Sequence, residues 1–443
     1  FAVGIFCGLA GILVCSFLGG MRAVTWTQVA QYIILIAAIL IPVSMIAHKD
    51  GLGWVPQLSY GRLMERMESL EKQVRDEPLE QTVRDDYRRR AALMQQRLDM
   101  LPHSFVEEKL RLTQQVADLR RRNGPLREIK EREKALEQFP RDAAAAQVVW
   151  TQQRDDMLMR AAAPLPMHEP FPTVSDEDRR MHERNFLSLL LCLSLGTASL
   201  PHILTRYNTT TSVASARRSV GWTLFFVALF YVTVPVLAVL IKYEMLTNLV
   251  GHHFADLPQW LTQWRKVEPT LISLADTNGD GIVRWSEIQM QPDMVVLAAP
   301  EIAGLPYVMS GLIAAGALAA ALSTADGLLL TIANALSHDV YYHMVDPGAS
   351  SQRRVTISKI LLLGVALFAS YVASLNTGNI LFLVGAAFSL AASSLFPVLV
   401  LGVFWKRTTR LGAVAGMLAG LLVCIYYIVS TYPFFAQMTG FAG

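Results

Sequence analysis

The sequence predicts an all-α polytopic membrane protein, a helical bundle that crosses the bilayer several times and carries a long polar insert. Of the 443 residues, 53% are hydrophobic and 17% are charged, and the mean hydropathy is +0.35. Several apolar runs are about 20 residues long, which is enough to cross a hydrocarbon layer of roughly 30 Å. The charged residues are concentrated in one block. So many long apolar runs cannot all be buried in the core of one soluble domain.

Eight membrane helices are predicted from these apolar runs, over residues 1–20, 22–47, 186–206, 219–243, 305–338, 355–375, 379–404 and 411–432. Lys and Arg gather in alternate short connections, as at Arg22, Arg217 and Arg353. Because basic loops stay in the cytoplasm, we expect a multi-pass protein of the bacterial inner (cytoplasmic) membrane. The membrane parts are then 1–47, 186–243 and 305–443, and the long connections 48–185 and 244–304 are periplasmic.

The N-terminus and the cysteines carry two further expectations. The chain opens at Phe1 within an apolar run, without an initiator Met or a charged leading segment. This is not the pattern of a signal peptide, so we expect a fragment that lacks its N-terminal helices. Cys7, Cys15, Cys192 and Cys424 lie in apolar segments and have no disulfide or metal spacing, which predicts free thiols.

The first long connection, 48–185, is amphipathic with a helical period. Its apolar residues follow a 4-3-4 spacing, beginning with Leu63, Met67, Leu70 and Val74, and its helical runs are interrupted by Pro78, Pro102 and Pro125. This pattern predicts an extramembrane helical hairpin or a short coiled-coil bundle. The simpler interpretation is a solvated insertion that packs only on itself. Binding of a protein partner, or self-association, through residues 55–160 is the alternative.

The second long connection contains the sharpest local motif, a 12-residue segment over 276–287 that fits an EF-hand loop. The predicted calcium ligands at loop positions 1, 3, 5, 7 and 12 are Asp276, Asn278, Asp280, Ile282 (by its carbonyl) and Glu287. Gly281 permits the sharp turn. We expect Ca²⁺ to bind in the weak extracellular class, roughly 0.1–1 mM; the alternative is an acidic loop that keeps the shape without the ion. Short helices are expected on both sides, over 269–275 and 286–290.

The predicted helix over 305–338 is rich in small residues and carries a cluster of oxygens. Ala320, Ser323 and Thr324 share one helical face, and their hydroxyl and carbonyl oxygens suit a hard monovalent cation. The alternative is that both hydroxyls bond back to the carbonyl of the preceding turn. Asp326 is an ionisable residue in a membrane helix, which makes it a candidate for the ion or solute pathway. Its alternative is a structural role beside an Arg or a backbone amide.

A third constellation interrupts the predicted helix over 186–206. It comprises Gly196, Thr197, Ser199, Pro201 and His202. Broken helices expose backbone groups to ions and substrates inside a membrane, so these residues are assigned to the solute and ion pathway. A plain proline kink, with His202 as an ordinary helix-end histidine, is the alternative.

Taken together, three segments resemble the sodium:solute symporter family, in its acetate-permease-like branch. They are residues 19–28, residues 196–202 with Arg206, and residues 320–324 with 337–341. The resemblance implies a leucine-transporter-like fold of inverted repeats. In that fold 1–47 would be core helices 4 and 5, 186–243 core helices 6 and 7, and 305–443 core helix 8 onward. It also implies that Ala320, Ser323 and Thr324 form half of the site for the coupling Na⁺, the other half coming from a first core helix that is not in this sequence.

Two departures from the family pattern stand out. Gln28 occupies a position where sugar- and proline-type members carry Asp, which removes the carboxylate of a second ion site. Thr25, Thr27 and Gln31 are the remaining polar candidates on that helix, and Thr27 and Gln28 are assigned to the pathway. The insert 48–185 and the EF-hand-like loop are not standard parts of acetate or proline permeases and suggest a large-insert subfamily.

The function expected from this sequence is sodium-coupled symport of a small organic solute, such as the monocarboxylate acetate, by alternating access. No enzyme constellation, Walker loop or nucleic-acid motif is present in the sequence, so the chain is not expected to be an enzyme. The expected partners are the solute and the lipid bilayer. The alternatives are a transporter-like sensor or interaction protein with a calcium-binding periplasmic region, an eight-helix channel, and a non-transporting fragment.

Overall fold

The computed structural model describes residues 2–122, 124–137, 139–164, 166–167, 171, 176–207, 210–267, 271–374 and 380–431. The chain divides into two compact units. The first comprises Phe1–Gln57, Phe171–Leu237 and Val296–Gly443, and the second comprises Leu58–Pro170 and Ala238–Val295.

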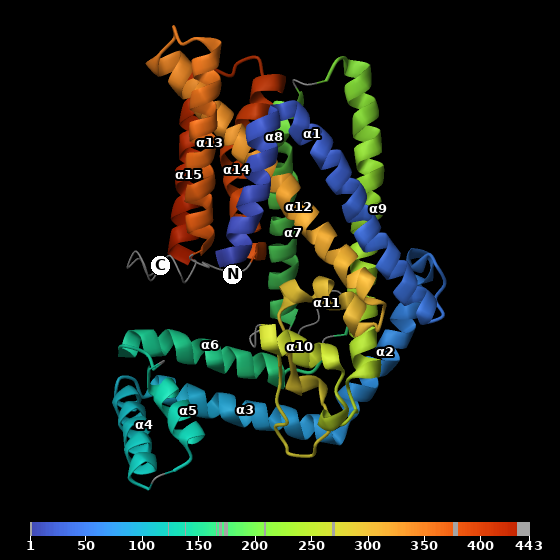
Figure 1. Ribbon diagram of the computed structural model, residues 1–443, viewed down its shortest axis with the longest axis vertical. Coiled ribbons are helices and arrows are strands. Elements are labelled where there is room, and N and C mark those ends of the chain that lie inside the picture. Colours follow the sequence, from blue (N-terminus) through green and yellow to red (C-terminus); the bar gives the residue numbers. More distant parts are fainter. Residues whose placement is uncertain are drawn as a thin grey trace. The chain divides into compact units, whose positions relative to one another are not determined.

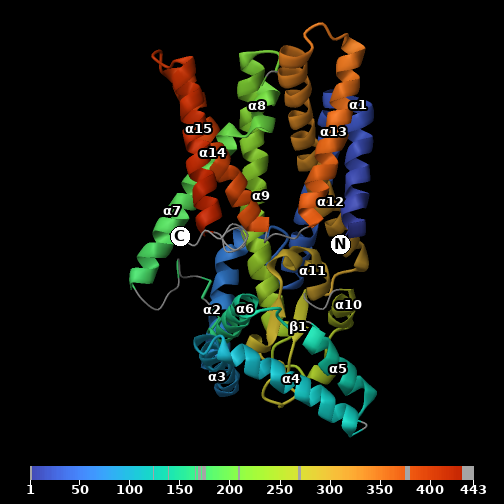
Figure 2. The same cartoon turned by 90° about the vertical axis from the view of Figure 1, so that its left-hand side faces the viewer.

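The first unit is built from long apolar helices. They are α1 (Ala2–Lys49), α7 (Asp176–Ser199), α8 (Pro201–Tyr207), α9 (Val213–Asn248), α11 (Val295–Ile302), α12 (Tyr307–Asn334), a π-helical continuation η5 (Ala335–Val345), α13 (Ser351–Ser374), α14 (Ile380–Phe404) and α15 (Arg410–Thr431). Most of them run alongside one another in both views (Figures 1 and 2). Within the described residues, seven helices are long and apolar enough to cross a membrane. This confirms the helical membrane class, and these seven candidate spans do not test the span predicted over 1–20, which lies outside the residues on which they rest.

The two helices predicted over 1–20 and 22–47 form one continuous helix, α1, so the predicted break at residue 21 is wrong. Gly11 nevertheless lies against the Leu322 side chain, and Gln28 bonds to the carbonyl of Ser323. The 17 residues between Gly11 and Gln28 would cover about 25 Å in a straight helix. Because both positions meet neighbouring residues of α12, α1 must bend back on itself, and its ribbon changes direction sharply in Figure 1. The connection predicted to be a loop is therefore helical.

Close helix packing in the first unit depends on small residues. A Cβ atom at Gly196 of α7 would stand 2.6 Å from the carbonyl oxygen of Phe388 in α14. Glycines fill the same role where Gly316 of α12 meets Ala38 of α1 and where Gly420 of α15 meets α14. Small residues let membrane helices approach closely, which dispersion contacts then stabilise. Cys192 and Cys424 are free thiols; the side chains of the other two cysteines lie outside the described residues.

The second unit contains the helical insert and the calcium-loop segment. Its helices are η1 (Pro56–Ser59), α2 (Tyr60–Asp76), α3 (Pro78–Asp99), α4 (His103–Arg121), α5 (Leu126–Glu137), α6 (Ala143–Ala161), η2 (Phe254–Asp256), α10 (Gln259–Val267), η3 (Trp285–Glu287) and η4 (Pro292–Met294). Two strands, β1 (Ile272–Leu274) and β2 (Ile288–Met290), pair antiparallel with Ile272 opposite Met290.

The short helix expected over 269–275 is therefore wrong where the structure describes it, and the one expected over 286–290 is helical only at Ser286 and Glu287, in η3. Residues 272–274 and 288–290 are strands instead. The physical reason lies in the alternation of side chains: Ile272 and Leu274 are buried on one face while Ser273 between them is half-buried. An alternation of two suits a strand and not a helix. Pairing the strands satisfies backbone groups on either side of the loop.

The amphipathic spacing of the insert forms its core. Leu63 and Met67 of α2 are fully buried, and Val83 and Tyr87 of α3 pack with Ala161 at the end of α6. Helices α3 and α6 pack against each other as a hairpin. The pattern of apolar residues therefore predicted the helical insert, although it did not indicate which helices pair.

Candidate functional site

A polar cavity of about 300 Å³ lies between α1, α8 and α12 in the first unit. It is lined by Gln28, Gln31, Tyr32, Leu35, His202, Ile203, Ala319, Ala320, Ser323 and Thr324. The cavity therefore brings together five residues that the sequence assigned to ion or solute sites: Gln28, His202, Ala320, Ser323 and Thr324. They come from three helices far apart in the chain, and a polar cavity inside a membrane bundle is a site for an ion or a polar ligand.

The oxygens of α12 form a compact group at one wall of this cavity. The Ser323 hydroxyl donates to the Ala320 carbonyl at 2.9 Å, and the Thr324 hydroxyl donates to the same carbonyl at 3.3 Å. This is the back-bonded arrangement that the sequence left open as an alternative. It occupies the hydroxyl protons but leaves oxygen lone pairs on both side chains. The three residues still present oxygens side by side, as a hard cation requires.

The facing wall is the polar side of α1. The Gln28 amide nitrogen donates to the Ser323 carbonyl at 2.6 Å, which links α1 to α12 and fixes the amide orientation. Gln28 Oε1, Gln31 Oε1 and the Tyr32 hydroxyl are buried and have no hydrogen-bond partner within the described part of the chain. Each unsatisfied buried polar atom costs about 1–3 kcal/mol. Three such atoms on one cavity indicate a site that a ligand completes.

Tyr32 is the site residue that the sequence reasoning missed. Its ring packs edge-to-face on Phe226 of α9, with the ring centroids 5.8 Å apart. A signal was available, because Gln28, Gln31, Tyr32 and Leu35 follow the i, i+3, i+4, i+7 spacing of one helical face. Three of these four residues are polar in a membrane helix, which is the feature that marks a lined cavity.

The motif around Gly196 lies at a different place from this cavity. Ser199 is fully buried, and its hydroxyl lies 3.1 Å from the carbonyl oxygen of Ala391 in α14. The same proton is shared with carbonyls of its own helix, those of Leu195 at 2.9 Å and Gly196 at 3.1 Å. The Thr197 hydroxyl donates back to Leu193 at 2.6 Å. Pro201 starts α8 and separates it from α7, so His202 alone of this motif lines the cavity. The structure thus places Gly196 and Ser199 at the contact between α7 and α14.

Asp326 and Thr27 also lie outside the lining of the cavity. The Asp326 side chain is 1% exposed on α12. The Thr27 hydroxyl donates to the Val24 carbonyl at 2.9 Å, within its own helix.

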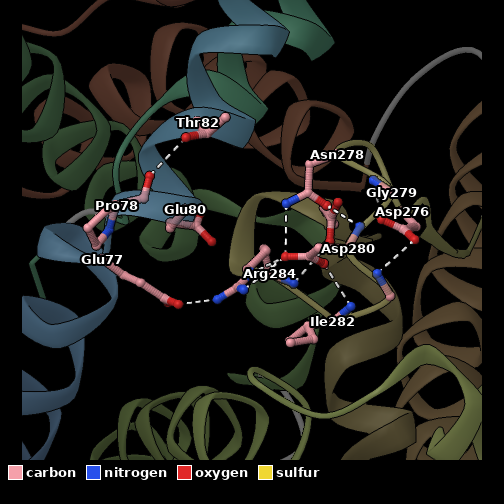
Figure 3. A network of polar contacts seen from close by, with 12 residues as sticks. Glu77, Pro78, Glu80, Thr82, Asp276, Asn278, Gly279, Asp280, Ile282 and Arg284 are labelled. Carbon is pink, nitrogen blue, oxygen red and sulfur yellow. Dashed lines mark hydrogen bonds and ion pairs between the residues drawn. The ribbon is translucent and has the colours of Figure 1, made fainter.

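The second candidate site is the EF-hand-like loop, which Figure 3 shows from close by. Asp276 accepts backbone N–H bonds from Gly279 at 2.8 Å and Gly281 at 3.1 Å. Asn278 Oδ1 accepts one from Asp280 at 3.1 Å, and Asp280 Oδ1 accepts one from the Ile282 amide at 2.8 Å. Gly279 and Gly281 have φ of +74° and +71°, a region that favours glycine. The loop therefore wraps its oxygens inward, as an EF-hand loop does.

The twelfth loop position and an arginine complete this site. Glu287 is fully buried and accepts backbone N–H bonds from Thr277 at 2.6 Å and Arg284 at 3.0 Å. The Arg284 guanidinium donates to Asp280 Oδ2 at 2.9 Å and pairs with Glu77, the residue before α3. Among the described residues, no group of three or more His, Cys, Asp or Glu side chains is placed to hold a metal ion. In this conformation the Arg284 guanidinium is the positively charged group that contacts the Asp280 carboxylate.

Two carboxylates of this loop, Asp280 and Glu287, have pKa values shifted in opposite directions. Burial raises the pKa of Asp280, but the Ile282 amide and the Arg284 guanidinium outweigh it and hold that pKa below its usual value. For Glu287, burial comes first and raises the pKa, and the neighbouring charges of Asp276 and Asp280 raise it further. The loop therefore stabilises negative charge at Asp280 more readily than at Glu287.

The insert holds this loop from the side of α3. Glu80 is fully buried and accepts N–H bonds from Trp285 at 2.9 Å and Ser286 at 3.0 Å, together with the Ser286 hydroxyl. The Tyr87 hydroxyl lies 3.0 Å from the Thr277 hydroxyl. A buried carboxylate that accepts several bonds is strongly held. The loop and the insert hairpin are thus joined by buried polar contacts, which sequence spacing could not reveal.

Comparisons with known proteins show which proteins the chain resembles. Residues 287–420 match the family model described as the Sodium:solute symporter family. Over all 443 residues the chain is 64% identical to a protein named as an uncharacterized symporter in Cupriavidus necator. Over residues 287–420 the chain is thus similar to the sodium:solute symporters. The match covers 65% of the length of the Cupriavidus relative.

A more distant relative carries a substrate in its name. The monocarboxylic acid transporter of Corynebacterium glutamicum is 30% identical over 250 residues, which are 55% of this chain and 38% of that protein. No solved structure matches the chain. The family model describes transporters, and the Cupriavidus relative is named as a symporter. Both confirm the prediction that the chain is not an enzyme.

Proposed function

We propose that the chain forms part of a sodium-coupled symporter that imports a small organic solute, a monocarboxylate such as acetate, by alternating access. The observation that carries the proposal is the cavity that joins Ser323 and Thr324 of α12 to the unsatisfied polar atoms of α1. The family match covers α12 to α14 and the first half of α15, so it includes the cation wall of this cavity. We assign the chain a leucine-transporter-like fold on the strength of that family.

In this proposal the cation site uses oxygens from two helices. The Ala320 carbonyl and the hydroxyl oxygens of Ser323 and Thr324 provide the α12 side. Gln28 Oε1 extends the oxygen set from α1, because its amide nitrogen is held by the Ser323 carbonyl. Carbonyl and hydroxyl oxygens inside a membrane bundle are the ligands that Na⁺ uses in transporters.

The solute site lies next to the cation site, on the same cavity. The Tyr32 hydroxyl has no partner among the described residues and can donate a hydrogen bond to a carboxylate. The amide nitrogen of Gln31, which lines the same cavity, is a second donor. His202 lines the same cavity and is a further candidate contact. The name of the Corynebacterium relative supports a monocarboxylate as the solute class.

Coupling follows from this adjacency. A cation bound at Ser323 and Thr324 places a positive charge beside the carboxylate of the solute, so each ligand strengthens the binding of the other. Both ligands shift the carrier between its outward- and inward-facing states only to the extent that they bind those states differently.

The test is uptake of labelled acetate by the intact protein in proteoliposomes, with an inward gradient of sodium or of potassium. We expect uptake in sodium alone, lost in the double variant Ser323→Ala/Thr324→Ala. Thr331→Ala is the matched control, because Thr331 lies on the same helix, bonds back to Gly327 at 2.8 Å and does not line the cavity. Equal uptake in sodium and potassium would contradict the proposal, and no uptake in either cation would favour the transporter-like sensor.

We further propose that the loop over 276–287 binds Ca²⁺ through oxygens of Asp276, Asn278, Asp280 and Glu287, with the Ile282 carbonyl. The inward-wrapped loop supports this assignment. Glu287 must then turn from the backbone amides of Thr277 and Arg284 to the ion. The test is calcium titration with thermal unfolding as the readout: Glu287→Gln should abolish calcium-dependent stabilisation. Equal stabilisation of Glu287→Gln and of the unaltered protein would exclude this site.

The insert is proposed to face the periplasm of a bacterial inner membrane and to bind a protein partner or a second copy through residues 55–160. Val106, Leu110 and Leu126 are large apolar side chains that are 57–77% exposed on α4 and α5. A cysteine introduced on α4 should react with a membrane-impermeant maleimide in intact cells and should cross-link to a partner or a second copy. Labelling only after the cells are lysed would contradict the periplasmic placement.

A further inference from the structure

A second polar cavity in the first unit, of about 550 Å³, lies where η5 meets the first turns of α13. Its polar lining residues are Asn334, Ser337, His338, Ser351, Arg354 and Ser358. Every one of these side chains can donate a hydrogen bond, and none of them is acidic. Such a lining selects an anion, because each donor can face an anionic oxygen.

Arg354 provides the charge of this cavity. Its guanidinium lies 4.3 Å from the ring centroid of Tyr342, which holds the side chain in place. The guanidinium also bonds to the Ser351 hydroxyl at 3.4 Å. No carboxylate among the residues that the structure describes forms an ion pair with Arg354. Its positive charge is therefore available to a ligand.

Two neighbouring side chains, Arg353 and His338, already contact acidic partners. Arg353 pairs with Asp346 at 3.2 Å, and His338 Nδ1 lies 2.9 Å from Asp339. Asp339 is not part of the cavity lining. These acidic side chains therefore leave the Arg354 charge unneutralised inside the cavity. The contrast between Arg353 and Arg354 also supplies a matched pair for an experiment.

The cavity lies at the end of one candidate membrane span and at the beginning of the next. The spans are Tyr307–Val345 and Ser351–Ser374, and the connection between them is only five residues long. Polar lipid headgroups lie at the depth where such spans end. Val355 of the cavity lining is 55% exposed, and Met344 and Val345 at the end of η5 are 76% and 67% exposed. They offer an apolar surface for an acyl chain.

We propose that this cavity binds the phosphate of an anionic phospholipid headgroup, with Arg354 as the central contact. The planar guanidinium matches two phosphate oxygens, and the serine hydroxyls and Asn334 can meet the others. Basic pockets between membrane helices are a known way to bind such headgroups. A free phosphate ion shares this chemistry, but the exposed Val355 of the lining and the exposed apolar end of η5 favour the lipid.

The test is native mass spectrometry of the intact protein after exchange into mixed phosphatidylglycerol and phosphatidylcholine vesicles. We expect the unaltered protein and Arg353→Gln to retain phosphatidylglycerol, and Arg354→Gln to retain it about tenfold less strongly. Arg354→Lys should show intermediate retention, because it keeps the positive charge and loses the planar guanidinium that can bind two phosphate oxygens. The melting temperatures of all variants are compared, and the Lys variant keeps the test valid if the Gln variant folds poorly.

Two outcomes would overturn the proposal. Equal retention of phosphatidylglycerol by Arg354→Gln and the unaltered protein would show that Arg354 does not hold the headgroup. In the second arm, inorganic phosphate is titrated onto the protein without added lipid. Binding of inorganic phosphate that depends on Arg354, with no Arg354-dependent retention of phosphatidylglycerol, would assign the cavity to a free anion and exclude the lipid.

Discussion

A methyl group at Gly196 is predicted to force α7 and α14 apart. Its Cβ would lie 2.6 Å from the carbonyl oxygen of Phe388, 2.8 Å from its Cβ and 3.0 Å from its Cα. Two of these three atoms belong to the backbone, so a side-chain rotation cannot relieve the overlap. Ordinary carbon contacts lie at about 3.5–4.0 Å, so the two helices must separate by up to about 1 Å.

The cost of this separation can be worked from two contributions. Overpacking a tight contact costs typically about 1–3 kcal/mol. The same displacement lengthens the bond from the Ser199 hydroxyl to Ala391, now 3.1 Å. Interhelical bonds of this type are worth on average about 0.6 kcal/mol in membranes. We therefore expect Gly196→Ala to lower the free energy of unfolding by about 1.5–3.5 kcal/mol.

The assay is reversible unfolding of the intact protein in mixed micelles with increasing sodium dodecyl sulfate. Gly221→Ala is the matched control, because no atom lies within 4 Å of a Cβ added at Gly221 of α9, and it should leave the unfolding free energy within about 0.5 kcal/mol. If Gly196→Ala unfolds with the same free energy as Gly221→Ala, the account of Gly196 as a packing residue is wrong. Such a result combined with lost uptake would return Gly196 to the solute pathway.

Three further predictions concern the loop and the cavity. Glu80→Ala leaves two backbone amides of η3 without an acceptor, which costs about 2–4 kcal/mol of local stability. These amides should then exchange with deuterium about 30- to 700-fold faster. The control Glu107→Gln, at an exposed residue, should leave their exchange rates unchanged. Arg284→Gln removes a cation from Asp280 and should tighten calcium binding about tenfold in a titration; weaker binding would mean that the arginine organises the loop. Tyr32→Phe should raise the KM for the solute about tenfold, while the exposed Tyr231→Phe leaves it unchanged; an unaltered KM would remove the Tyr32 hydroxyl from the solute site.

The membrane class was predictable because hydrophobic length is a property of contiguous residues. The span ends could be drawn to within several residues for α13, α14 and α15, since each begins or ends at charged or polar residues. The reversal of direction in α1 was predicted, because two apolar runs, each long enough to be a membrane helix, flank Arg22. The sequence did not predict that the chain stays helical through this reversal.

The candidate site was predictable in part, for a similar reason. Ser323 and Thr324 could be recognised from the residues next to them in the sequence. The place of Tyr32 in the cavity depends on helices that lie near it only in space. The strands at 272–274 and 288–290 were missed because three residues are too few to establish a period. Their pairing is a tertiary contact across the loop. The buried contact from Glu80 to the loop joins residues 206 positions apart and has no local signal.

The central claim is that a cation at Ser323 and Thr324 strengthens the binding of a carboxylate solute in the same cavity. The most direct measurement is the equilibrium dissociation constant of labelled acetate for the purified intact protein, in sodium and in potassium at equal ionic strength. The account predicts at least about tenfold tighter binding in sodium, which corresponds to a coupling free energy of about 1.4 kcal/mol. Dissociation constants that agree in the two cations would contradict it.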